Sequence, residues 1–289
     1  MKKILAILLA ATMMVPLAAC SAQQQSGNNS EQQETTAAQT ETKSSQTEND
    51  TETIYQVALL QSLTQGYYHG IIKVSEIKKH GDIGIGTFEG VNGEMIVLDG
   101  TVYQALGDGT VQEAADNETV PFSNVTFFDK DGSLELSDIN DVNALKEKLN
   151  AMVEENGKNL FYFVKMSGTF EKMNVRSEIK QEKPYKPLDK ALETDQREFN
   201  YDNITGTVVA LYCPDYMGGL NTPGWHFHFI SDDKTKGGHL LDLQFAKATA
   251  EYDATPGFDM CLTDNGDFQK MELSKDVSDA IKKVETNEE

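Results

Sequence analysis

Residues 223–230, PGWHFHFI, constrain the fold of this chain more than any other stretch, because aromatic side chains and histidines alternate along them. In an extended strand, successive side chains point to opposite faces of the sheet. His226 and His228 are therefore expected on one face, while Phe227 and Phe229 enter the opposite layer. The alternation predicts a strand that carries two imidazoles side by side.

A polar run, residues 231–238 (SDDKTKGG), follows this strand and is typical of a loop between two strands. Such a loop would bring His239 back beside the pair as a third nitrogen donor. Three neutral imidazoles suit zinc or a similar first-row divalent ion and leave coordination positions for water or substrate. We therefore expect a metal site at His226, His228 and His239.

An ordinary structural interpretation of the histidines remains open, because His-x-His pairs also occur on strands as half-buried rings. Two observations favour metal ligation. Three of the five histidines lie in this stretch, whereas His69 and His80 are far away in sequence. Gly224, Gly237 and Gly238 also permit a close approach of the backbone around the site.

Residues 1–20 have the pattern of an export signal. A basic end, Lys2 and Lys3, precedes an apolar stretch that is too short to span a membrane comfortably, and LAAC ends at Cys20. The pattern resembles a bacterial lipoprotein signal, in which Cys20 becomes the lipidated first residue; a plain secretory peptide is the alternative. Both predict export, and the first predicts a lipid anchor at the outer face of the cell membrane.

Residues 21–52 are mostly Gln, Ser, Thr, Asn and Glu, so they cannot bury enough apolar surface to become ordered, and we expect a disordered tether. The formal net charge of −21 argues against a nucleic-acid partner, because no basic stripe is present. An anionic small molecule would need a local positive centre, such as a metal ion and a buried arginine. We expect Cys213 and Cys261 to be separate thiols.

The remaining pattern predicts an α/β (α+β) fold that is β-rich, with two domains built on mixed and antiparallel sheets and few helices. We place a β-rich N-terminal domain at residues 53–190 and a metal-binding C-terminal domain at residues 191–289. The polar, proline-bounded residues 176–188 are predicted to connect them.

One helix is clear, over residues 138–155, with Asp138 or Asn140 as its cap and with helical spacing of Leu145, Leu149 and Val153. Residues 161–166 and 169–175 are predicted to form paired strands around Gly168.

Several segments carry a resemblance to a known family: GIGTF at 84–88, GEM at 93–95, TVPF at 119–122, FYFVKMSGTF at 161–170, the run 176–187 with QEKPY, and residues 223–245. In this order and spacing they resemble the α-acetolactate decarboxylase family across nearly all of residues 53–289. The histidine stretch is the most specific of them.

The resemblance implies decarboxylation of 2-acetolactate to acetoin and carbon dioxide, without thiamine or pyridoxal. Acetolactate is a β-keto acid, so the electrons left by carbon dioxide can flow into the neighbouring carbonyl as an enediolate that a Lewis acid stabilises. The resemblance further implies Zn²⁺ as the cofactor, bound by His226, His228 and His239, and it suggests a homodimer.

Four more residues acquire roles through the resemblance. It implies that Arg176 holds the substrate carboxylate or stabilises developing charge, where a surface salt bridge is the ordinary alternative. Glu94 and Glu285, in a functional tail, would deliver a proton or position water, and without the resemblance they are a turn-flanking charge and a tail charge. Thr87 would line the pocket or cap a turn.

The chain departs from the family pattern after Arg176, where Ser177-Glu178-Ile179 stands in place of an expected threonine first and proline third. The lipoprotein-type signal is not a family-wide feature either.

Two rival functions stay open. The pattern PG-x-H-x-H resembles the start of a cupin motif, which would indicate a metal oxygenase or isomerase, although Asp232 or Asp233 stands near the place of the usual glutamate. A non-enzymatic lipoprotein that delivers zinc to other proteins would need the histidines but neither Arg176 nor Glu94.

Overall fold

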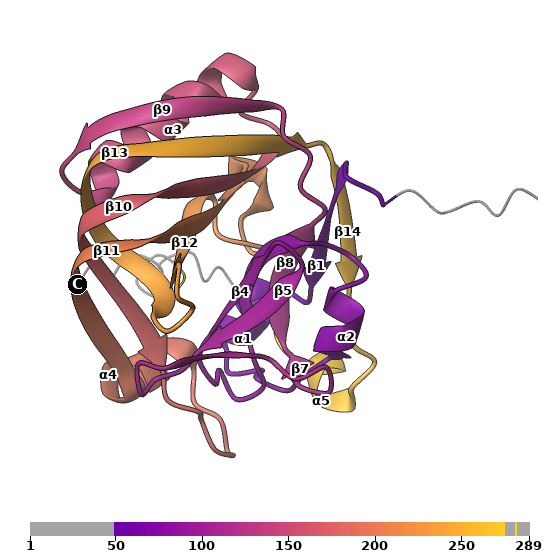
Figure 1. The fold of residues 1–289 in the computed structure, drawn as a ribbon. Coiled ribbons are helices and arrows are strands. Elements are labelled where there is room, and N and C mark those ends of the chain that lie inside the picture. Colours follow the sequence, from indigo (N-terminus) through magenta and orange to yellow (C-terminus); the bar gives the residue numbers. More distant parts are fainter. Residues whose placement is uncertain (1–48, 275–280, 282–289) are drawn as a thin grey trace, which may run out of the picture. The chain divides into compact units, whose positions relative to one another are not determined.

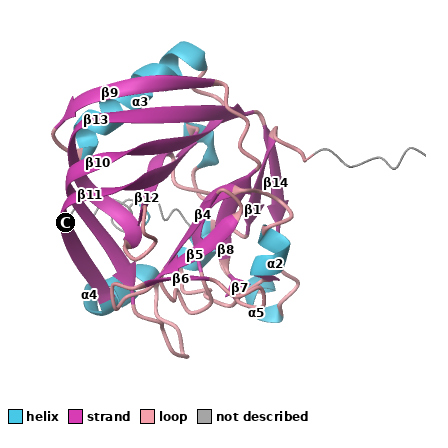
Figure 2. Ribbon diagram, viewed as in Figure 1, coloured by secondary structure: helices cyan, strands magenta, loops and turns pink. Residues whose placement is uncertain are grey.

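The structure is a computed structural model that describes residues 49–274 and residue 281. Figure 1 shows two β-sheets with a few helices beside them, and Figure 2 shows how little of the chain is helical. By their contacts, the described residues group as one compact unit. The predicted signal peptide with Cys20, nearly all of the predicted tether, and Glu285 lie outside the described residues.

The first sheet has seven strands. Their order is β14 (Gly257–Cys261), β1 (Thr53–Val57), β8 (Phe122–Thr126), β3 (Ile83–Thr87), β4 (Glu94–Leu98), β5 (Thr101–Ala105) and β6 (Val111–Glu113). β14 and β1 are parallel, and the other pairs are antiparallel. Every residue of β3, β4 and β8 is buried, which is typical of strands that are covered on both faces.

The second sheet is antiparallel and has five strands: β10 (Phe161–Glu178), β11 (Gln196–Cys213), β12 (Gly224–Ser231), β13 (Gly237–Thr255) and β9 (Gly132–Ile139). β10 pairs with β11 on one side and with β13 on the other, while β12 lies between β11 and β13. These four strands therefore close on themselves. The histidine stretch lies in β12 and at the start of β13, within this closed part.

The two sheets share a buried apolar core, in which Ile85 and Ile96 of the first sheet pack with Phe163, Val209 and Leu211 of the second. Each fully buried side chain of this size stabilises the fold by roughly 1.5–3 kcal/mol relative to exposure. This shared core fixes the ends of β3 and β4 relative to β12 and β13.

The longest helix, α3 (Val142–Asn156), covers the second sheet through Leu145, Leu149 and Val153, which are all buried. Its apolar spacing was predicted correctly, and Gly157 follows its last residue. The predicted caps, Asp138 and Asn140, were wrong: β9 continues to Ile139, and the Asp141 side chain instead accepts a hydrogen bond from the Ala144 N–H at 2.8 Å.

The prediction of two paired strands around Gly168 was also wrong, because β10 runs unbroken from Phe161 to Glu178. Gly168 lies opposite Gly206 of β11 and Ala248 of β13, so small residues meet where three strands pass closely. β10 also takes in Arg176, Ser177 and Glu178, which the sequence placed in a connecting segment.

The other elements are short: α1 (Leu60–Thr64), α2 (Val74–Ile77), α4 (Leu188–Asp195), α5 (Gly266–Gln269), the 3-10 turn η1 (Asp215–Met217), and a two-stranded sheet of β2 (Ile72–Lys73) and β7 (Thr119–Val120). The predicted fold class, β-rich with mixed and antiparallel sheets and few helices, is confirmed. Strands from both sides of residue 190 share the five-stranded sheet. Cys213 and Cys261 are both free thiols, as expected.

Among the helices in residues 49–274, none has the length and apolar character that crossing a membrane requires.

Candidate metal centre

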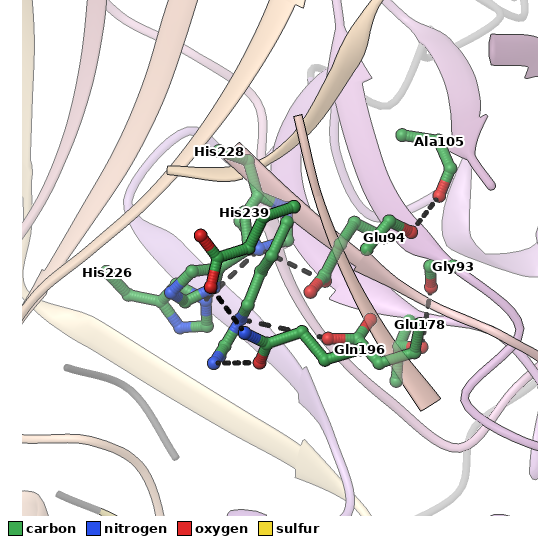
Figure 3. A network of polar contacts seen from close by, with 12 residues as sticks. Gly93, Glu94, Ala105, Glu178, Gln196, His226, His228 and His239 are labelled. Atoms are coloured by element: carbon green, nitrogen blue, oxygen red, sulfur yellow. Dashed lines mark hydrogen bonds and ion pairs between the residues drawn. The ribbon is translucent and has the colours of Figure 1, made fainter. Parts of the chain in front are cut away.

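Three histidines converge where β12 meets β13. The Nε2 atom of His226 lies 3.1 Å from Nε2 of His228 and 3.1 Å from Nδ1 of His239. One nitrogen from each ring lies within 4.8 Å of the other two. Figure 3 shows the three rings turned toward one another. The structure therefore brings together the three histidines that the sequence grouped.

The turn between β12 and β13 explains why His239 returns to this place. The Ser231 hydroxyl donates to Asp233 Oδ1 at 2.6 Å and accepts the Lys236 N–H at 3.0 Å, while the Ser231 N–H donates to the Lys236 carbonyl at 2.8 Å. A serine and an aspartate thus supply the polar contacts of a tight turn. The turn sets the register in which His228 and His239 lie directly opposite.

A backbone carbonyl of the first sheet fixes the orientation of the His228 ring. Its Nδ1 lies 2.8 Å from the carbonyl oxygen of Met95 in β4. Because a carbonyl can only accept, Nδ1 carries the proton and donates it, and the Nε2 lone pair of the neutral ring faces His226. A second partner that orients a ligand in this way is typical of metal-binding histidines.

Burial keeps the imidazoles of His226 and His228 neutral. Removal from water lowers the pKa of His226 to about 3, with smaller contributions from the charges of Arg176 and Lys146. The pKa of His228 lies well below its usual value, again chiefly through burial. Metal ligation requires neutral imidazole, so three such nitrogens fit a first-row divalent ion, although they do not select one metal among several.

Arg176 lies directly beside the histidines, because it is opposite His239 in the β10–β13 ladder. The side chain is 3% exposed. Gly238 makes this close pairing feasible: a Cβ on it would come within 2.4 Å of the Arg176 carbonyl oxygen. A buried guanidinium beside neutral imidazoles provides the local positive charge that an anionic ligand needs.

Two further residues hold the guanidinium. Glu178 Oε1 lies 3.7 Å from Arg176 Nε, and Arg176 NH1 donates to Gln196 Oε1 at 3.1 Å. Sequence reasoning assigned neither residue to the site, because it placed Glu178 in a connecting segment. Had β10 been extended past Val175, the i, i+2 spacing would have put Arg176 and Glu178 on one face.

Glu94 reaches the site from the first sheet. It begins β4, and its Oε2 lies 3.4 Å from His228 Nε2. Its side chain is 9% exposed. The site is therefore built where the two sheets meet, with a carboxylate from one beside a histidine from the other.

Several of these groups line a cavity of about 40 Å³. Its polar side consists of Thr87, Glu94, Arg176, Glu178, His226 and His239, and its apolar side of Leu60, Leu63, Val91, Phe122, Leu188 and Leu192. Ile281 is buried in the same apolar cluster as Leu60, Leu63 and Leu188. Ile281 thus packs against the body of the protein next to the cavity.

Thr87 combines the two roles between which the sequence left a choice. It borders the cavity, and its hydroxyl donates to the Gly93 carbonyl at 2.8 Å, which fixes the turn before Glu94. The position of Glu285 cannot be compared with these residues, since it lies outside the described part of the chain.

The fold and the site define a protein in which three converging histidines could hold a metal ion, beside a small cavity that two of them border together with a guanidinium and two carboxylates. A family model described as alpha-acetolactate decarboxylase matches residues 54–275. The chain belongs to the alpha-acetolactate decarboxylase family.

Individual relatives agree with this assignment. An alpha-acetolactate decarboxylase of Methanosarcina mazei is 40% identical over 237 residues, which cover 82% of this chain and 81% of the relative. The enzyme of that name from Bacillus subtilis strain 168 is 35% identical over 243 residues, covering 84% and 93%. A crystal structure of the Bacillus subtilis strain 168 protein superposes with a TM-score of 0.78 at 34% identity, covering 81% of this chain and 99% of that one.

Proposed function

We propose that this protein decarboxylates 2-acetolactate to acetoin and carbon dioxide, with zinc as its resident ion. The observation that carries the proposal is the convergence of His226, His228 and His239 beside a cavity that Arg176 and Glu94 border, in a chain of the alpha-acetolactate decarboxylase family. The cavity combines a positive group for a carboxylate with an apolar wall for methyl groups.

The reaction needs no organic electron sink. When the bond to the carboxylate carbon breaks, its electron pair moves into the adjacent ketone and gives an enediolate, to which a proton must then be added at carbon. A zinc ion, when bound by the three histidines, supplies a Lewis acid for the hydroxyl and carbonyl oxygens of the substrate. The residues of the chain bind, orient and protonate.

Arg176 binds the substrate carboxylate in this proposal. Its guanidinium is buried, held by Gln196 and Glu178, and beside His239, so it presents a fixed donor edge in a medium of low dielectric constant. A fixed partner costs little reorganisation when the substrate enters. Arg176 therefore determines which face of the bound substrate points toward the histidines.

Glu94 moves the proton. Its Oε2 lies 3.4 Å from His228 Nε2, so a carboxylic acid there reaches a carbon atom held in front of the histidines. We also assign a proton-transfer role to Glu285. Ile281, four residues earlier in the sequence, is buried against the apolar side of the same cavity, which supports this assignment.

The apolar side of the cavity, represented by Leu60, Phe122 and Leu188, contacts the methyl groups and keeps water away from the reacting carboxylate. Exclusion of water favours loss of carbon dioxide. The localised charge of the carboxylate loses its hydration in the cavity, whereas the charge of the transition state is more dispersed and needs less hydration.

We further propose that the protein is exported and lipid-anchored through Cys20 at the outer face of the cell membrane. The basic end, apolar stretch and LAAC sequence of residues 1–20 support this proposal.

The test is acetoin formation from racemic 2-acetolactate by a fragment that begins at Thr53, measured as prepared, after chelation, and after zinc is restored. We expect activity to be lost to the chelator and recovered with zinc. Manganese and cobalt, added separately, show whether zinc is specific. Zinc binding without acetoin above the spontaneous background would refute the decarboxylase and favour a metal-delivery protein.

A further inference from the structure

The buried pair of Arg176 and Glu178 places a carboxylate in a cavity that is proposed to bind a carboxylate. Both residues border the cavity, their side chains are 3% and 8% exposed, and Glu178 Oε1 lies 3.7 Å from Arg176 Nε. A buried negative charge is costly unless a positive charge compensates it, and Arg176 compensates Glu178. An anionic ligand that enters this cavity is therefore attracted by Arg176 and repelled by Glu178.

The end of β10 is fixed so that both side chains point into the cavity. Ser177, between them, points the other way, and its hydroxyl donates to the Ala105 carbonyl of β5 at 2.7 Å. Period two along the strand then sends Arg176 and Glu178 to the opposite face together. The Ser177 hydrogen bond thus holds the backbone between Arg176 and Glu178 against the first sheet.

Gln196 completes the arrangement. It lies opposite Glu178 in the β10–β11 ladder and accepts from Arg176 NH1 at 3.1 Å. The guanidinium thus has a carboxylate 3.7 Å from its Nε and a neutral hydrogen-bond acceptor at its Nη1. Glu178 offsets the positive charge in the cavity, whereas Gln196 holds Arg176 without changing the net charge.

We propose that Glu178 is a positioning and specificity residue that makes the cavity select singly charged carboxylates over doubly charged ones. The inference rests on the proposed function, since it concerns how the same cavity chooses its anionic substrate. Glu178 offsets the charge of Arg176, so a ligand with one carboxylate is bound while a second carboxylate is repelled. 2-Acetolactate carries one carboxylate and its other end is an apolar acetyl group, which fits this charge pattern.

The test compares two ligands of equal carbon skeleton, 2-hydroxy-2-methylbutanoate with one carboxylate and 2-hydroxy-2-methylbutanedioate with two. Their dissociation constants are measured by calorimetry on the zinc-loaded protein, so the result does not depend on turnover. We expect wild type to prefer the monoanion. Glu178→Gln, which keeps the shape but not the charge, should shift the preference toward the dianion by about tenfold or more.

Three further variants separate charge from structure. Glu178→Asp keeps the charge and should keep the monoanion preference. Gln196→Glu adds a carboxylate on the other side of Arg176 and should weaken the dianion further, so it tests the proposal even if Glu178→Gln does not fold. Glu171→Gln is the matched control, because Glu171 lies on the exposed face of the same strand and binds Gln244.

An unchanged ratio of the two dissociation constants in both Glu178→Gln and Gln196→Glu would overturn the inference, and so would failure of wild type to bind either ligand. The acetoin assay is independent of this result. Acetoin formation with an unchanged ratio would remove the role of Glu178 alone, whereas a shifted ratio without acetoin would remove the decarboxylase and leave an anion-selective site.

Discussion

Arg176 and His239 are direct partners in the β10–β13 ladder, and the same His239 is the direct partner of His228 in the β12–β13 ladder. One residue of β13 therefore joins the strand with the other histidines to the strand with the guanidinium. Because these ladders are backbone-bonded, the sheet sets the spacing between the backbone positions that carry His228, His239 and Arg176.

Arg176→Lys should raise KM for 2-acetolactate by about 10- to 100-fold, since lysine keeps the charge but loses the fork that bonds both to Gln196 and to a carboxylate. Steady-state kinetics with zinc content measured in parallel would check this. Arg197→Lys, at an exposed position on β11, is the control and should leave KM unchanged. An Arg176→Lys enzyme with unaltered KM would exclude carboxylate recognition by the fork.

Glu94→Gln should lower kcat by about 10²- to 10⁴-fold while zinc stays bound, because glutamine has the size of glutamate but cannot transfer a proton. Glu94 lies 3.4 Å from His228, but it is not one of the three converging histidines, so the metal content of the variant should change little. Glu113→Gln, at an exposed position of β6, is the control. Wild-type kcat in Glu94→Gln would mean that another group donates the proton.

The histidine site was predictable from sequence because its information is local. Period two places His226 and His228 on one face of β12, and a short polar turn returns His239. Arg176 could be placed beside them only through a family resemblance, because its neighbour His239 is far away in sequence. Glu178 was missed because the sequence placed it in a connecting segment, whereas β10 continues to Glu178 and period two puts its side chain on the same face as Arg176.

Similar limits apply to the fold. Alternating and buried apolar runs predicted a β-rich chain, and helical spacing predicted α3. Gly168 was read as a turn, because a glycine between two strand-like runs usually interrupts them. A small residue stands at position 168 because Gly206 and Ala248 pass closely on either side, and this is a tertiary contact that local sequence does not show.

Asp253→Asn should stabilise the protein increasingly as pH rises from about 4 to 8. Burial raises the pKa of Asp253 from 3.8 to about 7, and the nearby Asp131 and Glu52 charges add to this. Below pH 3.8 the carboxyl is protonated in both folded and unfolded states and costs nothing. Between 3.8 and 7 only the folded state keeps the proton, so wild-type stability falls as pH rises through this window, and the penalty is complete above pH 7.

The gain in Asp253→Asn at pH 8 should reach up to about 4 kcal/mol, less what the altered hydrogen bonds with Asp129 and Thr255 cost. Urea unfolding at pH 4, 6 and 8 would measure it, with the exposed Asp202→Asn as control. A stability difference between Asp253→Asn and wild type that is the same at all three pH values would contradict the assigned pKa.

Ile281→Ala should reduce kcat about as strongly as removal of residues 284–289, by tenfold or more, while the melting temperature of the protein changes little. Ile281 is buried beside Leu60, Leu63 and Leu188 at the apolar side of the cavity, and loss of such a buried side chain costs about 2–5 kcal/mol of local attachment. If Glu285 acts in the cavity, it depends on this attachment.

The measurement is kcat and melting temperature for Ile281→Ala, for the truncation, and for Leu262→Ala, whose side chain is 50% exposed, as control. A truncated protein that retains full kcat would eliminate Glu285 from the mechanism, and a loss in the truncation but not in Ile281→Ala would show that the tail is held elsewhere.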